Sequence, residues 1–405
     1  MYKNVQHFCF FIAGIALFSF QCTDFESSSD YSSDQTNRFV ITGAFENLIK
    51  NADSLATKKP VSINNEKNQY LGFHPGTYAS MACYWWPDPA GSDGLPYIRV
   101  DGHVNPDTRT DRSDLPAMIE MAKRTEVLAL AYKSTGNEIY AEHAMNQLYT
   151  WFIDPNTAML PHLEHAQMIR GVDTGRSYGV IDTWWLVRVI QSIPLLEESG
   201  LWNDAIEKPI QNWFTHYLNW LRNSEFGLKE MESKNNHGTW YDVQVVTIAV
   251  YLDQTDFAKL HLETVSAKRI NRQITRNGRQ RYETRRPRPE HYSIYNISGW
   301  LELLMYAEHL NADLQQNRSL FGGTIEDGVL YLISLMQTAD FDDILDPMDR
   351  TDSDRLYLDL LFKSSAFFEN PAFYHEIKRI HPLIRNPEIV FLRYPEDVNH
   401  FESSP

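Results

Sequence analysis

Residues 232–242, ESKNNHGTWYD, place two amides, a histidine, an indole and a phenol around one glycine. Asn236 could serve as the N-cap of a following helix, whose first backbone N–H groups need acceptors. That role does not account for Asn235, His237 and Tyr241. Histidine and tyrosine side chains exchange protons, and amide groups donate hydrogen bonds to anions. The stretch is therefore interpreted as one half of a catalytic site.

The other half is predicted in an arginine-rich segment further along the chain. Residues 268–288 contain nine basic residues and one acid, Glu283, whereas the whole chain has a formal net charge of −16. A run of charges is usually a solvated face. This run, however, is followed by Tyr292 and a new helical pattern, and Arg286 can hold a carboxylate through two parallel hydrogen bonds. The segment therefore predicts an anionic substrate.

Together the two segments supply the groups for β-elimination on a chain of uronic acids. Asn236 and Arg286 can neutralise the C6 carboxylate and stabilise the enolate-like state that forms when the C5 proton leaves. His237 and Tyr292 can take that proton and give one to the departing O4. The ordinary pKa of a tyrosine is about 10, so neighbouring positive charge must lower it if Tyr292 is to be the base. The chemistry requires no metal and no cofactor.

Two further segments have compositions typical of binding loops. Residues 68–112 are rich in glycine, proline, aspartate and aromatic residues, which predicts a long ordered loop. Its rings either form a lid packed on the core or bind sugar, and the substrate-binding candidates are His74, Tyr84, Trp85 and Trp86.

The second segment covers residues 162–185. His162 and His165 are three residues apart, but they lack the HExxH spacing and a third ligand, so no metal site is predicted. Arg170 and Arg176 are flanked by glycines, which favours an anion-contacting loop that leads into a helix, with a simple glycine-rich turn as the alternative.

Amphipathic helices must position these loops. Apolar residues recur at three- and four-residue spacing through most of the chain from residue 38 onward, and few stretches alternate as strands do. The expected helices cover residues 38–57, two helices within 115–153, 180–197, 203–222, 241–254, 256–274, 290–311, 324–338 and 352–368. Hairpins of such helices bury their apolar faces only by stacking on neighbours. The fold class predicted is all-α, an (α/α) toroid or barrel of about six to seven helical hairpins with long cleft-lining loops.

Composition and the N-terminal residues limit the possible partners and the cellular location of the protein. The negative charge excludes nucleic acid as the general partner. Residues 1–21 predict an export signal, followed by Cys22, a site for lipid attachment, with plain secretion as the alternative. Residues 22–37 predict a flexible tether and residues 38–405 a single catalytic domain. Only Cys83 is left for the folded part, so no internal disulfide forms there. The prediction is an exported monomer, lipid-anchored at a bacterial outer membrane on its periplasmic or outer side.

Four motifs make the chain resemble the alginate-lyase superfamily of polysaccharide lyases between about residues 70 and 300. They are YWWPDP with DGLPYIRVDGHVNPD, GRSYGVIDTWW, NNHGTWYDVQ and ETRRPRPEHYSIYN. The sequence is most similar to polysaccharide lyase family 38 and more distantly to family 5. The resemblance implies an (α/α) toroid with a cleft across its mouth.

The resemblance also implies roles for individual residues. Asn236 and Arg286 would be neutralisers, His237 a base or neutraliser, and Tyr292 the acid. Because the arginine is doubled in this sequence, Arg285 competes with Arg286 for its role. The aromatic loop would line substrate subsites, and two further candidates would lie near the carboxylates, Arg176 and Tyr241.

Stereochemistry makes the role of His237 conditional. In β-D-mannuronate and β-D-glucuronate the C5 hydrogen and O4 lie on one face, so Tyr292 would act as both base and acid. In α-L-guluronate they lie on opposite faces, so His237 would be the base and Tyr292 the acid. The same residues therefore serve either polymer.

The leading prediction is a polyuronate lyase that acts on alginate. Three alternatives stay open: a lyase of glucuronan or another glucuronic-acid glycan, a glycoside hydrolase and a non-catalytic glycan-binding lipoprotein. A hydrolase needs two carboxylates that flank the bond, and the nominees would be Glu283, Asp182 and Asp242.

Overall fold

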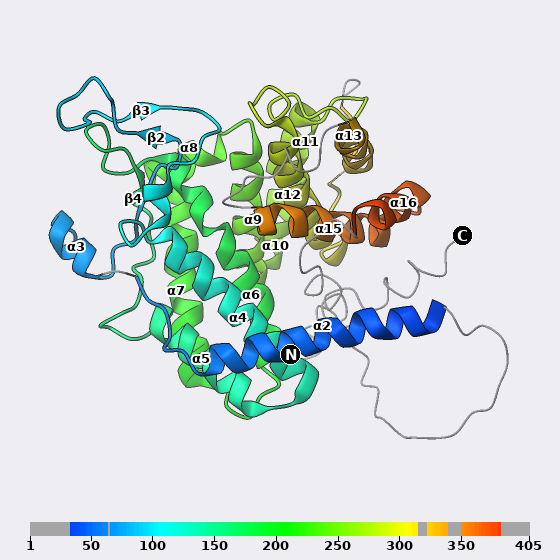
Figure 1. Ribbon diagram of the computed structural model, residues 1–405, viewed down its shortest axis with the longest axis horizontal. Helices are drawn as coiled ribbons and strands as arrows, with labels where there is room; N and C mark the ends of the chain where they lie inside the picture. The colour runs from blue at the N-terminus through cyan, green and yellow to red at the C-terminus, as the bar shows by residue number, and fades with distance from the viewer. Residues whose placement is uncertain (1–32, 64, 315–321, 339–349, 382–405) are drawn as a thin grey trace.

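Helices make up most of the fold, as Figure 1 shows. The computed structural model describes residues 33–63, 65–314, 322–338 and 350–381, so the predicted export signal and Cys22 lie outside the described residues. Within those ranges, no helix is both long enough and apolar enough to cross a membrane.

The main helices alternate between an inner and an outer layer. Each inner helix packs against the next in the ring, since α4 contacts α6, α6 contacts α9, α9 contacts α12, and α12 contacts α15. The inner helices are α4 (Leu115–Thr135), α6 (Trp185–Leu196), α9 (Asn236–Tyr251), α12 (Pro289–His309) and α15 (Arg350–Phe367).

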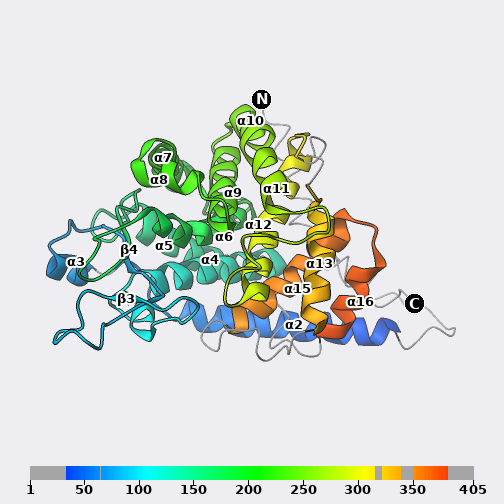
Figure 2. The same ribbon diagram turned by 90° about the horizontal axis from the view of Figure 1, so that it is seen from above.

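An outer helix follows each inner helix in the sequence. These helices are α5 (Glu138–Phe152), α7 (Asp204–Asn223), α10 (Thr255–His261), α13 (Ile325–Thr338) and α16 (Pro371–Ile380). The pairs curve around a common centre (Figure 2). The predicted all-α class and (α/α) toroid are therefore confirmed.

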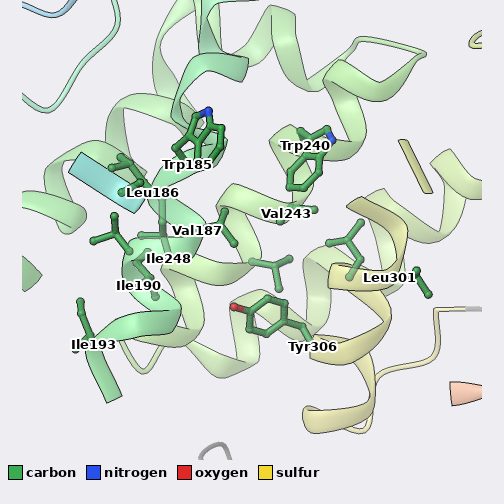
Figure 3. Packing of buried hydrophobic residues seen from close by; sticks show 14 of the residues in the cluster. Trp185, Leu186, Val187, Ile190, Ile193, Trp240, Val243, Ile248, Leu301 and Tyr306 are labelled. Atoms are coloured by element: carbon green, nitrogen blue, oxygen red, sulfur yellow. The ribbon is translucent and has the colours of Figure 1, made fainter. Parts of the chain in front are cut away.

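Buried aliphatic and aromatic side chains fill the space between neighbouring inner helices. Trp185 and Ile190 of α6, Val243 and Ile248 of α9, and Leu301 of α12 are 6% exposed or less (Figure 3). Full burial of side chains of this size contributes roughly 1.5–3 kcal/mol each. Helices α9 and α12 have neighbours on several sides, so they are buried around most of their circumference and show no strong amphipathic stripe.

The N-terminal helix α2 and several short elements complete the fold. They are α2 (Ser33–Ala56), α3 (Asn65–Leu71), the 3₁₀ helices η2 (Pro106–Arg109) and η3 (Ser177–Trp184), α8 (Glu225–Met231), the π-helical turn η4 (Leu262–Ser266) and α11 (Ala267–Gln273). Helix α2 packs against α4 and α5. It begins at Ser33, so the last part of the predicted tether is helical.

Two small β-ribbons give the aromatic loop its order. Strand β1 (Ala79–Met81) pairs in parallel with β4 (His165–Met168), and β2 (Trp85–Trp86) pairs antiparallel with β3 (Ile98–Arg99). These strands and their loops lie at one end of the toroid, at the top of Figure 1. Strand pairing thus holds the loop predicted over residues 68–112. These strands are too short and irregular to leave an alternating pattern in the sequence.

Candidate active site

A cleft of about 660 Å³ runs between the β-ribbons and the inner helices. Its lining comes from α2, the loop from Met81 to Asp101, α4, β4, η3, α6, α9, α12 and the segment just before α12. Residues from both predicted halves of the site meet here, including Asn236, His237, Arg286 and Tyr292.

Tyr292 stands at the centre of a hydrogen-bonded group near the start of α12. Its hydroxyl lies 2.8 Å from Arg286 Nη2 and 2.6 Å from the hydroxyl of Tyr84. The guanidinium of Arg286 also lies over the Tyr292 ring, 3.9 Å from its centroid. Asp101 accepts two hydrogen bonds from Arg286, from Nη2 at 2.9 Å and from Nε at 3.3 Å. The phenol of Tyr292 is therefore held in one orientation beside a fixed positive charge.

The protonation state of Tyr292 suits a proton donor. Burial raises the pKa of Tyr292 above its ordinary value, although the hydrogen bond with Tyr84 and the charge of Arg286 oppose this. Arg286 thus acts in the direction that the role of base would require, but the effect of burial on the pKa is larger. Burial likewise raises the pKa of Tyr84. Both phenols are protonated at neutral pH.

Asn236 is the first residue of α9 and is held by a carboxylate from the other half of the site. Its backbone N–H and its side-chain Nδ2 each donate a hydrogen bond of 2.7 Å to Glu283. Asn235, at the N-cap position, makes no side-chain cap bond. Glu283 therefore caps α9 from a distance, and the helix begins earlier than the predicted residue 241. Burial raises the pKa of Glu283, while the two bonds from Asn236 oppose the shift.

His237 follows directly on the cleft side of α9. Its Nδ1 lies 2.5 Å from Glu230 Oε1, and Tyr178 packs edge-on against its ring with centroids 4.9 Å apart. Glu230 comes from the end of α8 and its side chain is only 1% exposed. The imidazole is thus fixed on two sides.

A buried arginine supports this whole segment from behind. Arg269 of α11 pairs with Asp242 at 2.8 Å and donates to the carbonyl oxygens of Met231 and Ser233. These carbonyls belong to the turn that leads into α9. A Cβ atom at Gly238 would overlap both the Arg269 guanidinium and the carbonyl of Ser233. Glycine is required at position 238 so that the Arg269 side chain can reach these carbonyl oxygens.

Buried amides connect α9, α11 and α12. The side-chain oxygen of Gln273 accepts hydrogen bonds from Thr239, Asn296 and Trp300 at 2.8–3.0 Å. Its Nε2 donates to the backbone oxygen of Asn235 at 2.9 Å. Satisfied buried networks of this kind are rigid. The network fixes the relative position of the two halves of the site.

A second polar group lines the cleft near η3. Arg176 donates to the backbone and side-chain oxygens of Gln167, and its guanidinium lies 5.1 Å from the Tyr178 ring centroid. Gln167 in turn donates to Asp182 at 2.9 Å, which also accepts from Ser80. Arg176 therefore lies at the cleft as predicted, and Gln167 and Tyr178 are cleft residues that the sequence did not single out.

The cleft extends toward α2 past two tryptophans, Lys123 and Arg188, and Arg188 pairs with Glu126 of α4 at 3.2 Å. Arg188 of α6 lies 5.3 Å from the Trp184 ring centroid and 5.4 Å from that of Trp185. Lys123 of α4 lies 5.4 Å from the Trp185 ring centroid. The two tryptophans could be recognised in the sequence, but their contact with Lys123 of α4 could not be predicted from it.

Not all predicted binding residues reach the cleft. Tyr84 and Trp85 line it, whereas Trp86 donates to the backbone of His103 and does not line it. His74 is solvent-exposed and bonds to the carbonyl of the next residue.

Two other predicted site residues, Tyr241 and Arg285, lie outside the cleft. Tyr241 is 1% exposed and donates to Leu221 O at 3.0 Å, because its position on α9 turns it into the core. The prediction that it lies near substrate carboxylates is therefore not supported. Arg285 is exposed and outside the cleft lining, so Arg286 is the arginine that faces Tyr292.

The histidine pair of residues 162–165 has ordinary packing roles. His165 stacks on Phe73 with ring centroids 3.9 Å apart, and the intervening Glu164 accepts from Trp220 at 2.6 Å. Burial lowers the pKa of His162. Across the described ranges, no group of three or more histidine, cysteine, aspartate or glutamate side chains is placed to hold a metal ion.

The carboxylates nominated for hydrolysis are committed to other groups. Asp242 is fully buried against Arg269 and His261 and lies away from the cleft. Glu283 is 1% exposed and bonded to Asn236. Asp182 reaches the cleft lining but is 3% exposed, and burial raises its pKa against the bonds from Gln167 and Ser80. Of the three nominees, Asp182 alone lines the cleft.

What faces the cleft instead is an amide, a guanidinium, an imidazole and a protonated phenol on a helical toroid. The helical toroid, its cleft and the family match make the protein a polysaccharide lyase. The family model described as alginate lyase matches residues 74–341, more than half of the 405 residues. The chain belongs to the alginate lyase family.

Solved structures agree with this assignment. An alginate lyase from Bacteroides ovatus is 28% identical with a TM-score of 0.79, over 89% of this chain and 95% of that one. Alginate lyase A1-III from Sphingomonas species A1 is 15% identical with a TM-score of 0.51, over 80% of this chain and 87% of that one, and supports the fold alone. A comparison with curated protein sequences finds no match.

Proposed function

We propose that the protein cleaves alginate, a 1,4-linked polyuronate, by metal-independent β-elimination. The observation that carries the proposal is the hydrogen-bonded pair of Arg286 and Tyr292, which faces the same cleft as Asn236 and His237. The likeness to the Bacteroides ovatus alginate lyase supports alginate as the polymer. Within the superfamily, the motif combination favours polysaccharide lyase family 38 over family 5.

The reaction assigns one task to each group. Arg286 and the amide of Asn236 bind the C6 carboxylate and stabilise the charge that develops when the C5 proton leaves. His237 takes the C5 proton at α-L-guluronate, and Tyr292, entering as the phenolate, takes it at β-D-mannuronate. The electrons of the C5–H bond form the C4=C5 double bond. The C4–O4 bond breaks with its electron pair on O4, which takes the proton of Tyr292. The products are a new chain end and an unsaturated uronate.

Arg286 is oriented for this task before substrate arrives. Asp101 binds Nε and Nη2 of Arg286, and Tyr292 accepts a second hydrogen of Nη2. A guanidinium has five N–H donors, so the hydrogens of Nη1 remain for a substrate carboxylate. Burial disfavours the charge on Asp101, but Arg286 and Arg99 hold the pKa of Asp101 below its usual value, so it stays ionised.

The cleft lining supports a binding role for several aromatic and cationic residues. Trp85 and Tyr84 line one side, while Arg176, Arg188 and Trp185 line another. Sugar rings stack on such faces, and uronate carboxylates pair with such cations. The alternative polymer is glucuronan or another glucuronic-acid glycan, since β-D-glucuronate presents the same C5–H and O4 face as mannuronate.

A screen for ultraviolet absorbance tests the activity. The enzyme is incubated with polymannuronate, polyguluronate, mixed alginate and glucuronan, and the unsaturated product is followed by its absorbance. A rise with alginate substrates is expected. A rise with glucuronan alone would assign the alternative polymer, and no rise with any of the four would refute the lyase proposal for these substrates.

We also propose export with lipid attachment at Cys22, and a monomer in solution. The apolar run that ends at Cys22 supports the first, and the second is supported by a cleft whose catalytic groups all come from one chain. Loss of membrane association in Cys22→Ala, measured by cell fractionation, tests the anchor. Light scattering tests the oligomeric state.

A further inference from the structure

Glu230 holds the histidine of the site from the side opposite the cleft. Its Oε1 lies 2.5 Å from Nδ1 of His237, and its side chain is 1% exposed, compared with 15% for His237. We propose that Glu230 is a positioning residue that fixes His237 as the base for anti elimination, and that it therefore supports cleavage at α-L-guluronate rather than at β-D-mannuronate. This inference rests on the proposed lyase function.

The hydrogen-bonding chemistry of the pair determines which nitrogen faces the substrate. An ionised carboxylate only accepts hydrogen bonds, so Nδ1 of His237 must carry the hydrogen that it shares with Glu230. The lone pair of the neutral ring then lies on Nε2. Because His237 lines the cleft while Glu230 does not, Nε2 is the atom presented to the cleft.

The surroundings of Glu230 hold it in place. The hydroxyl of Ser233 lies 3.3 Å from Oε2, the carboxylate oxygen that does not face Nδ1 of His237. Arg269 binds the carbonyl oxygens of Met231 and Ser233, the residues that follow Glu230. On the other side of the imidazole, Tyr178 packs edge-on. The histidine therefore has little freedom to turn Nδ1 toward a substrate.

Only one of the two stereochemical routes uses this arrangement. At α-L-guluronate, Nε2 of His237 takes the C5 proton, the C5–H electrons form the C4=C5 bond, and O4 leaves with the C4–O4 electrons and takes the proton of Tyr292. At β-D-mannuronate, C5–H and O4 share one face, and Tyr292 serves both steps once its hydroxyl has given its own proton to solvent: the phenolate takes the C5 proton and passes it to O4. Loss of Glu230 therefore misplaces the base of the first route, His237, and affects no proton-transfer group of the second route.

The test compares wild type with Glu230→Gln on polyguluronate and on polymannuronate, with the same substitution at the exposed neighbour, Glu232→Gln, as the matched control. Glutamine keeps the size of the side chain but can offer its amide N–H to Nδ1, which selects the wrong tautomer. For Glu230→Gln we expect kcat on polyguluronate to fall at least about tenfold with KM unchanged, and kcat on polymannuronate to stay within about twofold. Glu232→Gln should resemble wild type on both.

Two further measurements separate positioning from a purely structural role. In a His237→Ala background, Glu230→Gln should cause no additional loss on polyguluronate, because the group on which it acts is gone. If Glu230→Gln does not fold, Glu230→Asp, which keeps the carboxylate, should show a smaller loss in the same substrate order.

Each contrary outcome has a distinct meaning. Equal losses on both polymers, or no loss on polyguluronate, would overturn the inference. A wild-type enzyme that cleaves polymannuronate but not polyguluronate would also overturn it while leaving the proposed function intact. A wild-type enzyme inactive on every polyuronate would refute the proposed function itself.

Discussion

Asn236 and Glu283 are 47 residues apart in the sequence and are joined by two hydrogen bonds of 2.7 Å. One bond satisfies a backbone N–H at the start of α9, and the other holds the side-chain amide that faces the cleft. A second N–H of that amide remains for a substrate carboxylate. A single buried carboxylate thus caps a helix and orients a neutraliser, and it joins the two halves of the site.

The adjacent arginines provide a matched pair for the neutralising role. Arg286 contacts Tyr292 and Asp101 in the cleft, whereas Arg285 is exposed. For Arg286→Ala we expect kcat/KM on alginate to fall by about 100-fold or more, the scale of losing a donor to a developing oxyanion. Arg285→Ala should stay close to wild type. Steady-state kinetics decide the matter, and a larger loss in Arg285→Ala would reverse the assignment.

Gly238 should be intolerant of any side chain. A Cβ there would overlap Arg269 and the Ser233 carbonyl, and overpacking of a tight site costs about 1–3 kcal/mol. We expect Gly238→Ala to lower the unfolding free energy by that amount in urea titrations and to reduce activity, because the overlap displaces the turn before α9. Gly200, where a Cβ meets no atom within 4 Å, supplies the control. Equal stabilities for Gly238→Ala and Gly200→Ala would contradict the packing argument.

The pH dependence of polyguluronate cleavage should reflect Tyr292 as an acid. An acid must be protonated to act, so kcat/KM is lost as the pH rises through its pKa in the free enzyme. Burial raises the pKa of Tyr292 above the ordinary tyrosine value of about 10. We therefore expect no loss from this group until the pH exceeds about 10. An alkaline limb well below that pH, abolished when Tyr292 is replaced, would show that the pKa is lowered instead.

The sequence predicted the helical class and the paired segments because both leave local signals. Periodic apolar residues mark the helices, and unusual clusters of polar groups mark the segments around His237 and Arg286. Tyr292 was found because it follows the arginine run closely. Where α9 begins was not predictable, since its cap comes from Glu283 rather than from a neighbouring residue.

Other features depend on tertiary packing. Tyr241 has the composition of a site residue, but its place on α9 turns it toward Leu221 and the core. Glu230 and Tyr178 complete the surroundings of His237. Glu230 lies in no motif, and the GRSYGVIDTWW motif that contains Tyr178 does not show that its ring packs on the histidine. Only the packing of α8 and η3 beside α9 brings them there.

The turnover of Tyr292→Phe on alginate tests the central claim most directly. Phenylalanine keeps the ring under the Arg286 guanidinium and removes only the hydroxyl that gives its proton to O4. With the circular dichroism spectrum and unfolding midpoint preserved, we predict that kcat, followed by ultraviolet absorbance of the unsaturated product, falls by about 100-fold or more. Turnover close to that of the wild type would contradict the account.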